Sequence, residues 1–111
     1  MREMTFSIYE EFTKTTDVFV DDVNRMVCVV LGLNGEAGEV AEKFKKIFRG
    51  DVKFDKNSKE QIALELGDVL WYLSRCASVI DYTLEDIAKM NIEKLKNRLH
   101  LNKIKGSGDT R

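Results

Sequence analysis

Apolar residues recur every three or four positions along most of the chain, and the strict alternation typical of strands is weak throughout. Four segments show this helical period, as expected of amphipathic helices that bury one face. The sequence contains no proline, so the strongest helix breaker is absent and long helices are permitted. The pattern therefore predicts four amphipathic helices and no sheet.

Residues with capping chemistry stand near the ends of the four segments. A Ser or Thr followed three residues later by an acid opens the first and last helices, and a glycine after the second can end it. The expected helices are Ser7, paired with Glu10, to about Val18; Asp22 to about Phe48, ending at Gly50; Asn57 or Ser58 to about Ile80; and Thr83, paired with Asp86, to about Leu99.

Short connections between amphipathic helices favour an all-α fold. We expect a four-helix, bundle-like subunit whose second and third helices form an antiparallel central hairpin, because the loop between them is short. A bundle this small often completes its core by oligomerising. Residues 1–111 are expected to form one domain, with a polar, glycine-rich tail from about residue 103 that is not helical.

The composition argues against two kinds of partner. A net charge of −1 disfavours binding to nucleic-acid polymers, which normally requires a basic excess. No apolar run reaches the length of a membrane span, and the N-terminus lacks the apolar region of a signal peptide. We therefore expect a cytoplasmic protein that does not bind membranes. Cys28 and Cys76 lack metal-type spacing and are expected to be reduced core residues.

One acidic pattern occurs in both the second and the third predicted helix. Residues 36–40 and 65–69 each read acid, apolar residue, glycine, acid, valine. Around each helix, measured from its apolar stripe, the first acid lies at about 300° and the second at about 240°. Antiparallel helices turn equal offsets to the same side of the pair, so four carboxylates are expected to converge. They belong to Glu36, Glu39, Glu65 and Asp68.

Converging carboxylates need a compensating charge. Two of them roughly 4 Å apart repel by about 4 kcal/mol at an effective dielectric constant of 20. Protonation, neighbouring lysines or a divalent cation would relieve this repulsion, and an all-oxygen cluster suits Mg²⁺ or Mn²⁺. The alternative is that Glu39–Lys43 and Glu42–Lys46 are ordinary surface pairs. That alternative explains the second helix but not the repeat in the third.

Two further features of these helices indicate a subunit interface. Glycine inside a helix costs about 1 kcal/mol relative to alanine. We therefore expect Gly38 and Gly67, at equivalent positions in the two patterns, to permit close approach by another helix or subunit. Apolar residues also lie outside the main stripes, and four helices of this length cannot cover them all. They are Met26, Val27, Val29, Leu31, Trp71 and Val79.

The segments "LGLNGEAGEVAEKFKK" and "ELGDVLWYL" carry ExxE on one helix and ExxD on the next, and they resemble the MazG-like nucleoside triphosphate pyrophosphohydrolases. The resemblance runs from about Thr5 to the C-terminus, and its paired acidic motif is fairly specific. It implies an all-α, Mg²⁺-dependent enzyme, with Mn²⁺ as a substitute, that cleaves nucleoside triphosphates between the α- and β-phosphates. The products would be a nucleoside monophosphate and pyrophosphate, and the assembly would be a homodimer or homotetramer. We expect the role to be the cleansing of nucleotide pools, with control of ordinary dNTP pools as the alternative.

The same resemblance makes the four acids of the repeated pattern catalytic metal ligands: Glu36, Glu39, Glu65 and Asp68. Which carboxylate acts as general base stays open.

Six further residues are expected to hold the substrate: Tyr72, Asn91, Lys94, Arg98, Lys105 and Arg111. The asparagine and two cations of "NIEKLKNR" resemble the family's phosphate-contacting segment. The alternatives are a buried helix–helix hydrogen bond for the asparagine and plain surface charges for the cations. The tyrosine, at about 280° on the acidic side, would contact the base or sugar, or else fill the core edge. The two tail cations would fold over the substrate or belong to a disordered end.

Two other functions compete with the enzyme hypothesis. A non-catalytic helical interaction or adaptor protein would need neither converging acids nor a metal. A di-iron carboxylate protein would need Glu-x-x-His motifs, and the one histidine, His100, is in none. Pyrophosphate release that depends on a divalent metal separates the enzyme from the adaptor.

Overall fold

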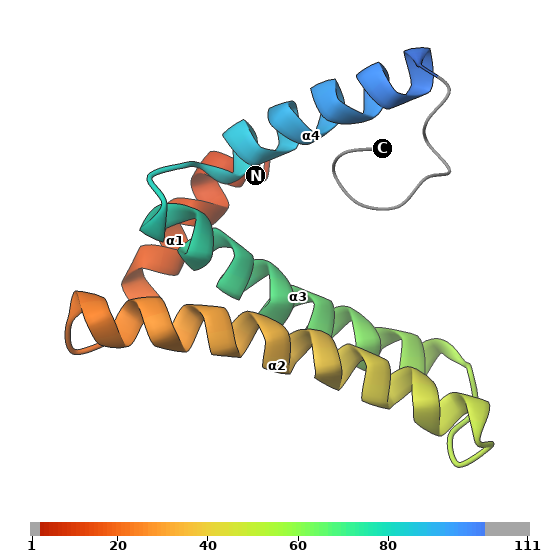
Figure 1. Cartoon of the computed structure of the whole chain (residues 1–111). Coiled ribbons are helices and arrows are strands. Elements are labelled where there is room, and N and C mark those ends of the chain that lie inside the picture. Colours follow the sequence, from red (N-terminus) through yellow and green to blue (C-terminus); the bar gives the residue numbers. More distant parts are fainter. Residues whose placement is uncertain (1–2, 102–111) are drawn as a thin grey trace.

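The computed structural model of the protein describes residues 3–101, and this part of the chain is built from helices without strands. The helices are α1 (Phe6–Thr16), α2 (Asp22–Phe48), α3 (Lys56–Val79) and α4 (Leu84–His100). In Figure 1, α2 and α3 lie side by side, α1 stands at one end of this pair, and α4 leads away from it. The predicted all-α class and antiparallel central hairpin are confirmed.

Each helix begins where a side-chain oxygen accepts a hydrogen bond from a backbone N–H three residues further on. The four caps are Thr5, Asp21, Asp55 and Thr83. The last was predicted together with its capping-box partner Asp86, and both are confirmed. These bonds satisfy N–H groups that have no partner inside a helix.

The predicted start of the first helix is wrong by one residue, and its cap is a different side chain. The Thr5 hydroxyl, not Ser7, accepts the backbone N–H of Ile8 at 3.1 Å. Glu10, the expected partner of Ser7, instead accepts the backbone N–H of Leu84 at 3.0 Å. A contact between α1 and the start of α4 therefore takes the side chain that the local pattern assigned to capping.

The third helix also begins earlier than predicted. Asp55, not Asn57, caps it by accepting the backbone N–H of Ser58 at 3.0 Å. Ser58 takes part as the second member of the capping box, because its hydroxyl accepts the backbone N–H of Asp55 at 2.9 Å. At the end of α2, Gly50 has a φ of +82°, which confirms it as the left-handed residue that follows the helix.

One glycine of α2 permits a close approach within the hairpin, and it is Gly32. A Cβ atom there would overlap the ring of Tyr72, so the ring can lie against α2 in this position only because Gly32 has no side chain. The expectation for Gly38 and Gly67 fails inside the subunit, since a Cβ at either would meet nothing within 4 Å among the described residues. A second subunit is the remaining candidate neighbour for both.

The apolar core of the described chain is small. Its buried apolar residues are Val29, Ile62, Ala77 and Leu84. Val29 was expected on the outer surface, and that prediction is wrong because it lies between the helices with none of its surface exposed. Cys28 and Cys76 are free and half-buried. The radius of gyration is 16.8 Å, against about 13 Å for a compact domain of about 100 residues.

A buried polar network holds α1 in place. Asp17 follows α1 in extended conformation, so the helix ends at Thr16 and not at the predicted Val18. The Asp17 carboxylate accepts hydrogen bonds from Nε of Arg25 at 3.0 Å and from Nε of Arg75 at 2.7 Å. Burial disfavours the Asp17 charge, but the two guanidinium groups outweigh it and lower the pKa of this carboxyl.

The same network includes the face of α1 that contacts α3. Thr13 and Ser74 are both fully buried, and their hydroxyl oxygens are 3.2 Å apart. The Thr13 hydroxyl also donates to the backbone carbonyl of Glu10 at 2.7 Å. Hydrogen bonds and ion pairs, more than apolar packing, therefore hold α1 on α3.

Candidate active site

Three carboxylates meet on the hairpin formed by α2 and α3. Glu36 of α2 and Glu65 and Asp68 of α3 each offer one oxygen, and these oxygens all lie within 4.8 Å of one another. Glu36 and Glu65 are half-buried, and Asp68 is exposed. The matched helical offsets therefore do bring acids of the two helices together.

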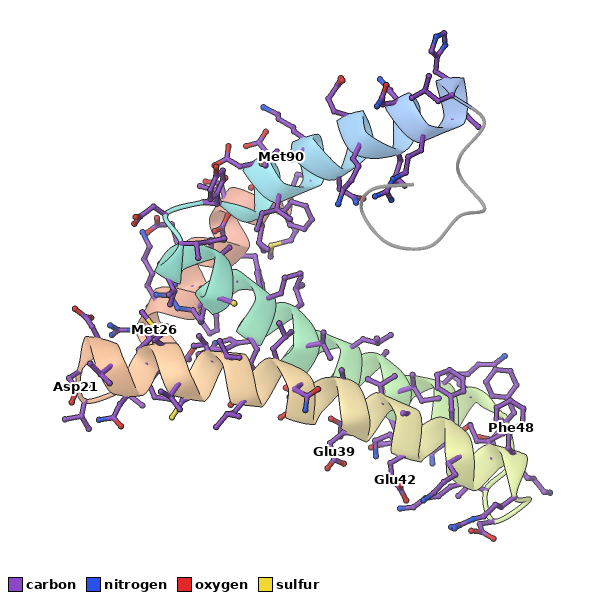
Figure 2. The ribbon with its side chains drawn as sticks, viewed as in Figure 1. Asp21, Met26, Glu39, Glu42, Phe48 and Met90 are labelled. Atoms are coloured by element: carbon purple, nitrogen blue, oxygen red, sulfur yellow. The ribbon has the colours of Figure 1, made fainter. Side chains whose placement is uncertain are left out.

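The fourth acid of the pattern, Glu39, lies outside this group of three. Its side chain is exposed and projects in Figure 2 from the side of α2 away from α3. Glu39 is still close enough for its charge to contribute to the electrostatics of Glu36, one turn earlier on the helix. The structure thus brings three of the four predicted ligands together and leaves the fourth one turn away.

The charge state of Glu36 reflects its neighbours. Burial raises the pKa of this carboxyl first, followed by a side-chain hydrogen bond with Glu65 and by the charges of Asp68, Glu65 and Glu39. Every one of these causes disfavours the carboxylate form. The cluster is therefore a place where a cation or a proton is stabilised.

A lysine approaches the cluster but does not balance it. Nζ of Lys43 lies 3.8 Å from Oε1 of Glu65 across the hairpin. The alternative of ordinary surface pairs predicted Lys43 with Glu39 and Lys46 with Glu42, whereas Glu42 pairs with Lys45 at 2.9 Å. One ammonium group beside three carboxylates leaves an excess of negative charge.

Next to the acids is an open hollow with an aromatic wall. It has a volume of about 420 Å³ and is lined by Phe12, Thr16, Glu36, Asp68, Trp71 and Tyr72. The Trp71 and Tyr72 rings meet edge to face with centroids 5.0 Å apart. Nε1 of Trp71 donates to the Thr16 hydroxyl at 2.7 Å. Trp71 thus packs against α1 of its own chain and is half-buried, and its predicted contact with another subunit stays a prediction.

The first helix contributes residues that the sequence pattern did not assign to the site. Phe12 and Thr16 line the hollow, and Tyr9 has a pKa raised by burial and by the charge of Asp68. The three residues follow one another at intervals of three and four, so they share a face of α1. That spacing was visible, but nothing in it linked the face to the acids on other helices.

The fourth helix stands apart from the cluster. Asn91 and Lys94 line a separate hollow of about 430 Å³ together with Ile87 and Met90. Asn91 is exposed, so the alternative of a buried helix–helix hydrogen bond for it is wrong within the described chain. Arg98 is 6% exposed.

Because α4 leads away from the hairpin in Figure 1, the subunit does not bring these residues of α4 to its own acids. Lys105 and Arg111 lie outside the described residues.

The donor set of the cluster suits a hard divalent cation. Carboxylate oxygens are the ligands that Mg²⁺ and Mn²⁺ prefer, and three from two helices leave room for water or phosphate oxygens. Thiol and imidazole groups are absent from this group of three. Among the four helices of residues 3–101, none combines the length and apolarity that crossing a membrane requires.

Comparisons with known proteins agree with this geometry. A family model described as the MazG nucleotide pyrophosphohydrolase domain matches residues 28–101. The "Gene 37 protein" of Mycobacterium phage L5 is 35% identical over 114 residues, which cover 97% of this chain and 100% of that protein. No solved structure is significantly similar to the chain. The matched region contains all three converging acids, whereas the α1 residues of the aromatic hollow precede it.

Proposed function

The chain belongs to the MazG nucleotide pyrophosphohydrolase family, and on this premise we propose that it hydrolyses nucleoside or deoxynucleoside triphosphates between the α- and β-phosphates. The products are a nucleoside monophosphate and pyrophosphate. The observation that carries the proposal is the meeting of Glu36, Glu65 and Asp68 within 4.8 Å on two helices of one hairpin. Such a cluster is costly without a cation, and a triphosphate brings cations with it.

Mg²⁺, or Mn²⁺ in its place, is the proposed cofactor. Glu36, Glu65 and Asp68 would hold it, with Glu39 one turn away as a fourth acid. The ion would neutralise phosphate charge and lower the pKa of an attacking water. A carboxylate that is not bound through both of its oxygens can accept the proton of that water.

The aromatic hollow is the proposed place for the base and sugar. Tyr72 and Phe12 line it beside Glu36 and Asp68, so a nucleotide whose phosphates reach the acids can place its base there. Aromatic side chains stack on all of the bases, because every base has a π-face. Selectivity among bases would then depend on polar groups of the same wall, such as the hydroxyls of Thr16 and Tyr72.

The phosphate-contacting role of α4 requires a second subunit. Asn91, Lys94 and Arg98 lie on a helix that leads away from the acids of its own chain. In a homodimer or homotetramer this helix can reach the acids of a neighbour. Lys105 and Arg111, outside the described residues, remain predicted substrate contacts on the same basis. The enzyme would act in the cytoplasm, where it would cleanse nucleotide pools.

The test is pyrophosphate release from a panel of nucleoside triphosphates with Mg²⁺, repeated with EDTA, and chromatography of the products. Glu36→Gln should abolish release, while Glu42→Gln, on the same helix but paired with Lys45 outside the cluster, should retain it. The appearance of nucleoside diphosphate and phosphate would assign another cleavage position. Absence of metal-dependent release for every nucleotide would favour the helical adaptor.

A further inference from the structure

The face of the hairpin that carries the three acids continues toward the loop between α2 and α3. On α2, positions 32, 36 and 43 follow helical spacing, and on α3 positions 72, 68, 65 and 61 do the same. Contacts across the pair follow this order. Gly32 faces Tyr72, Glu36 meets Asp68 and Glu65, and Lys43 approaches Glu65. The face therefore runs from the aromatic wall through the acids to a lysine.

Beyond that lysine is a second hollow, of about 230 Å³. It is lined by Lys43, Lys46, Ile47, Val52, Asn57, Ser58, Gln61 and Ile62. None of these lining residues is acidic, whereas the aromatic hollow contains two carboxylates. Its polar side chains supply two ammonium groups and two amides. The sign of the charge thus changes along the face, from negative at the acids to positive near the loop.

The two regions are joined without a gap. Lys43 lines the second hollow and also lies 3.8 Å from the carboxylate of Glu65. Lys43 therefore connects the acidic cluster to the second hollow on one face of the hairpin. Lysine binds phosphate as a point charge, and amide N–H groups add hydrogen bonds.

We propose that this second hollow, with Lys43 and Lys46 as its cations and Asn57 and Gln61 as its amides, binds the β- and γ-phosphates of the substrate and hence the pyrophosphate product. The proposal rests on the proposed function and gives the substrate a direction. The base lies at the aromatic end, the α-phosphate at the acids, and the terminal phosphates at the lysines. The hollow then favours triphosphates over monophosphates, because only the former supply charge at this end.

The test measures binding of inorganic pyrophosphate and of each common deoxynucleoside monophosphate to the full chain with Mg²⁺, by calorimetry. Lys46→Met should weaken pyrophosphate binding by at least about tenfold, as expected for the loss of a charged hydrogen bond, and leave monophosphate binding unchanged. Lys46→Arg should restore most of the pyrophosphate affinity. Lys46 is the better probe than Lys43, because it is exposed and its loss does not disturb Glu65.

Lys59→Met is the matched control. Lys59 belongs to the same end of the hairpin but lies over the Phe54 ring, 4.8 Å from its centroid, and does not line the hollow. Equal weakening by both lysine variants, equal loss of monophosphate binding, or no change in Lys46→Met would each overturn the proposal. If the wild-type chain releases pyrophosphate from nucleotides while Lys46→Met binds it normally, only this inference fails. If the wild type releases none, the proposed function fails first.

Discussion

Carboxylates held within 4.8 Å of one another repel, and a residue that relieves this repulsion changes both metal binding and stability. Three acidic neighbours of Glu36, namely Glu65, Asp68 and Glu39, all raise its pKa. Its ionised form therefore destabilises the metal-free fold, while the same charge attracts a cation. These two effects have opposite signs and can be measured separately.

Glu36→Gln should weaken Mn²⁺ binding by at least about tenfold, because the ion loses one anionic ligand, and it should abolish hydrolysis. In metal-free buffer the variant should melt no lower than the wild type. Because the folded pKa of Glu36 is raised, wild-type stability without metal should fall as the pH rises through that pKa, and the variant should lose this dependence. Glu39→Gln should weaken Mn²⁺ binding by a smaller factor. Titration calorimetry and melting curves decide; a lower melting temperature for Glu36→Gln contradicts strong repulsion.

For single residues, the sequence predicts well on which side of a helix a residue lies, but it predicts poorly which conformation the side chain adopts. The offsets of Glu36, Glu65 and Asp68 follow from 3.6 residues per turn, so their meeting was predictable. The outward course of Glu39 depends on its rotamer, which periodicity does not specify. Asn91 stands between apolar residues at helical spacing but is exposed, because no other helix of residues 3–101 covers it.

Among the helices, α1 depends most on a single ionic group. Asp17 is 3% exposed and joins Arg25 of α2 to Arg75 of α3 at the point where α1 ends. Breaking a buried ion pair leaves an uncompensated charge, which is usually costly. Since α1 also carries Phe12 and Thr16 into the aromatic hollow, the same group positions one wall of the site.

Asp17→Asn should lower the free energy of unfolding by about 3–5 kcal/mol, measured by urea denaturation at pH 7. The folded pKa of Asp17 is lowered, so its contribution is present above the unfolded value of about 3.9 and is lost as the pH falls through the folded pKa. Wild-type stability should thus drop in acid, and the variant should show less of this drop. Asp22→Asn, which removes the fully exposed partner of Arg25, is the control and should have little effect.

The two helices of the hairpin offer a paired glycine test. Gly32→Ala places a Cβ against the Tyr72 ring and should cost about 1–3 kcal/mol, as expected for overpacking. Gly38→Ala meets open space in the subunit and should stabilise the helix by up to about 1 kcal/mol. Chemical denaturation gives both values. A loss of stability in Gly38→Ala would indicate that a second subunit approaches there, as first expected.

Helix positions were predictable to within one or two residues because caps and apolar periods are local signals. Asp22, Phe48 and Thr83 fell where local chemistry placed them. The end of α1 differs from the prediction, because Asp17 adopts an extended conformation in which it binds arginines of α2 and α3. Ion pairs between residues far apart in the sequence produce no periodic pattern, so the sequence did not predict them.

For the whole molecule, the amount of uncovered apolar surface is the main observation. Exposed apolar side chains gather on the first half of α2 and along α4: Val23, Met26, Val27, Val30, Leu31, Met90, Ile92, Leu95 and Leu99. A monomer seldom exposes so many together. The direction of α4 was not predictable, because among the described residues this helix has few contacts with the rest of the chain that could specify it.

The wild-type chain should be a homodimer or homotetramer by light scattering at micromolar concentration. Leu31→Glu, at a side chain that is 66% exposed, should yield monomers or unfolded chain, because a buried interface does not tolerate an unpaired charge. Val20→Glu is the control: it adds the same charge at a side chain that is 91% exposed and precedes α2. A stable, active wild-type monomer would contradict the assembly. Trp71→Glu is a poorer probe, since Trp71 packs within its own chain.

The separation of α4 from the acids of its own chain has a consequence for mixtures of variants. If each site takes its acids from one subunit and Asn91 from the other, Glu36→Gln and Asn91→Ala inactivate different halves of every site. In a randomly exchanged dimer population, half of the dimers are hybrids, and each hybrid contains one site with neither substitution. Two inactive preparations, unfolded together and refolded, should therefore recover about a quarter of the wild-type activity. Sites complete within one chain would recover no activity. Complementation between the two variants would therefore show whether α4 contributes to the site of a neighbouring subunit, without a structure of the assembly.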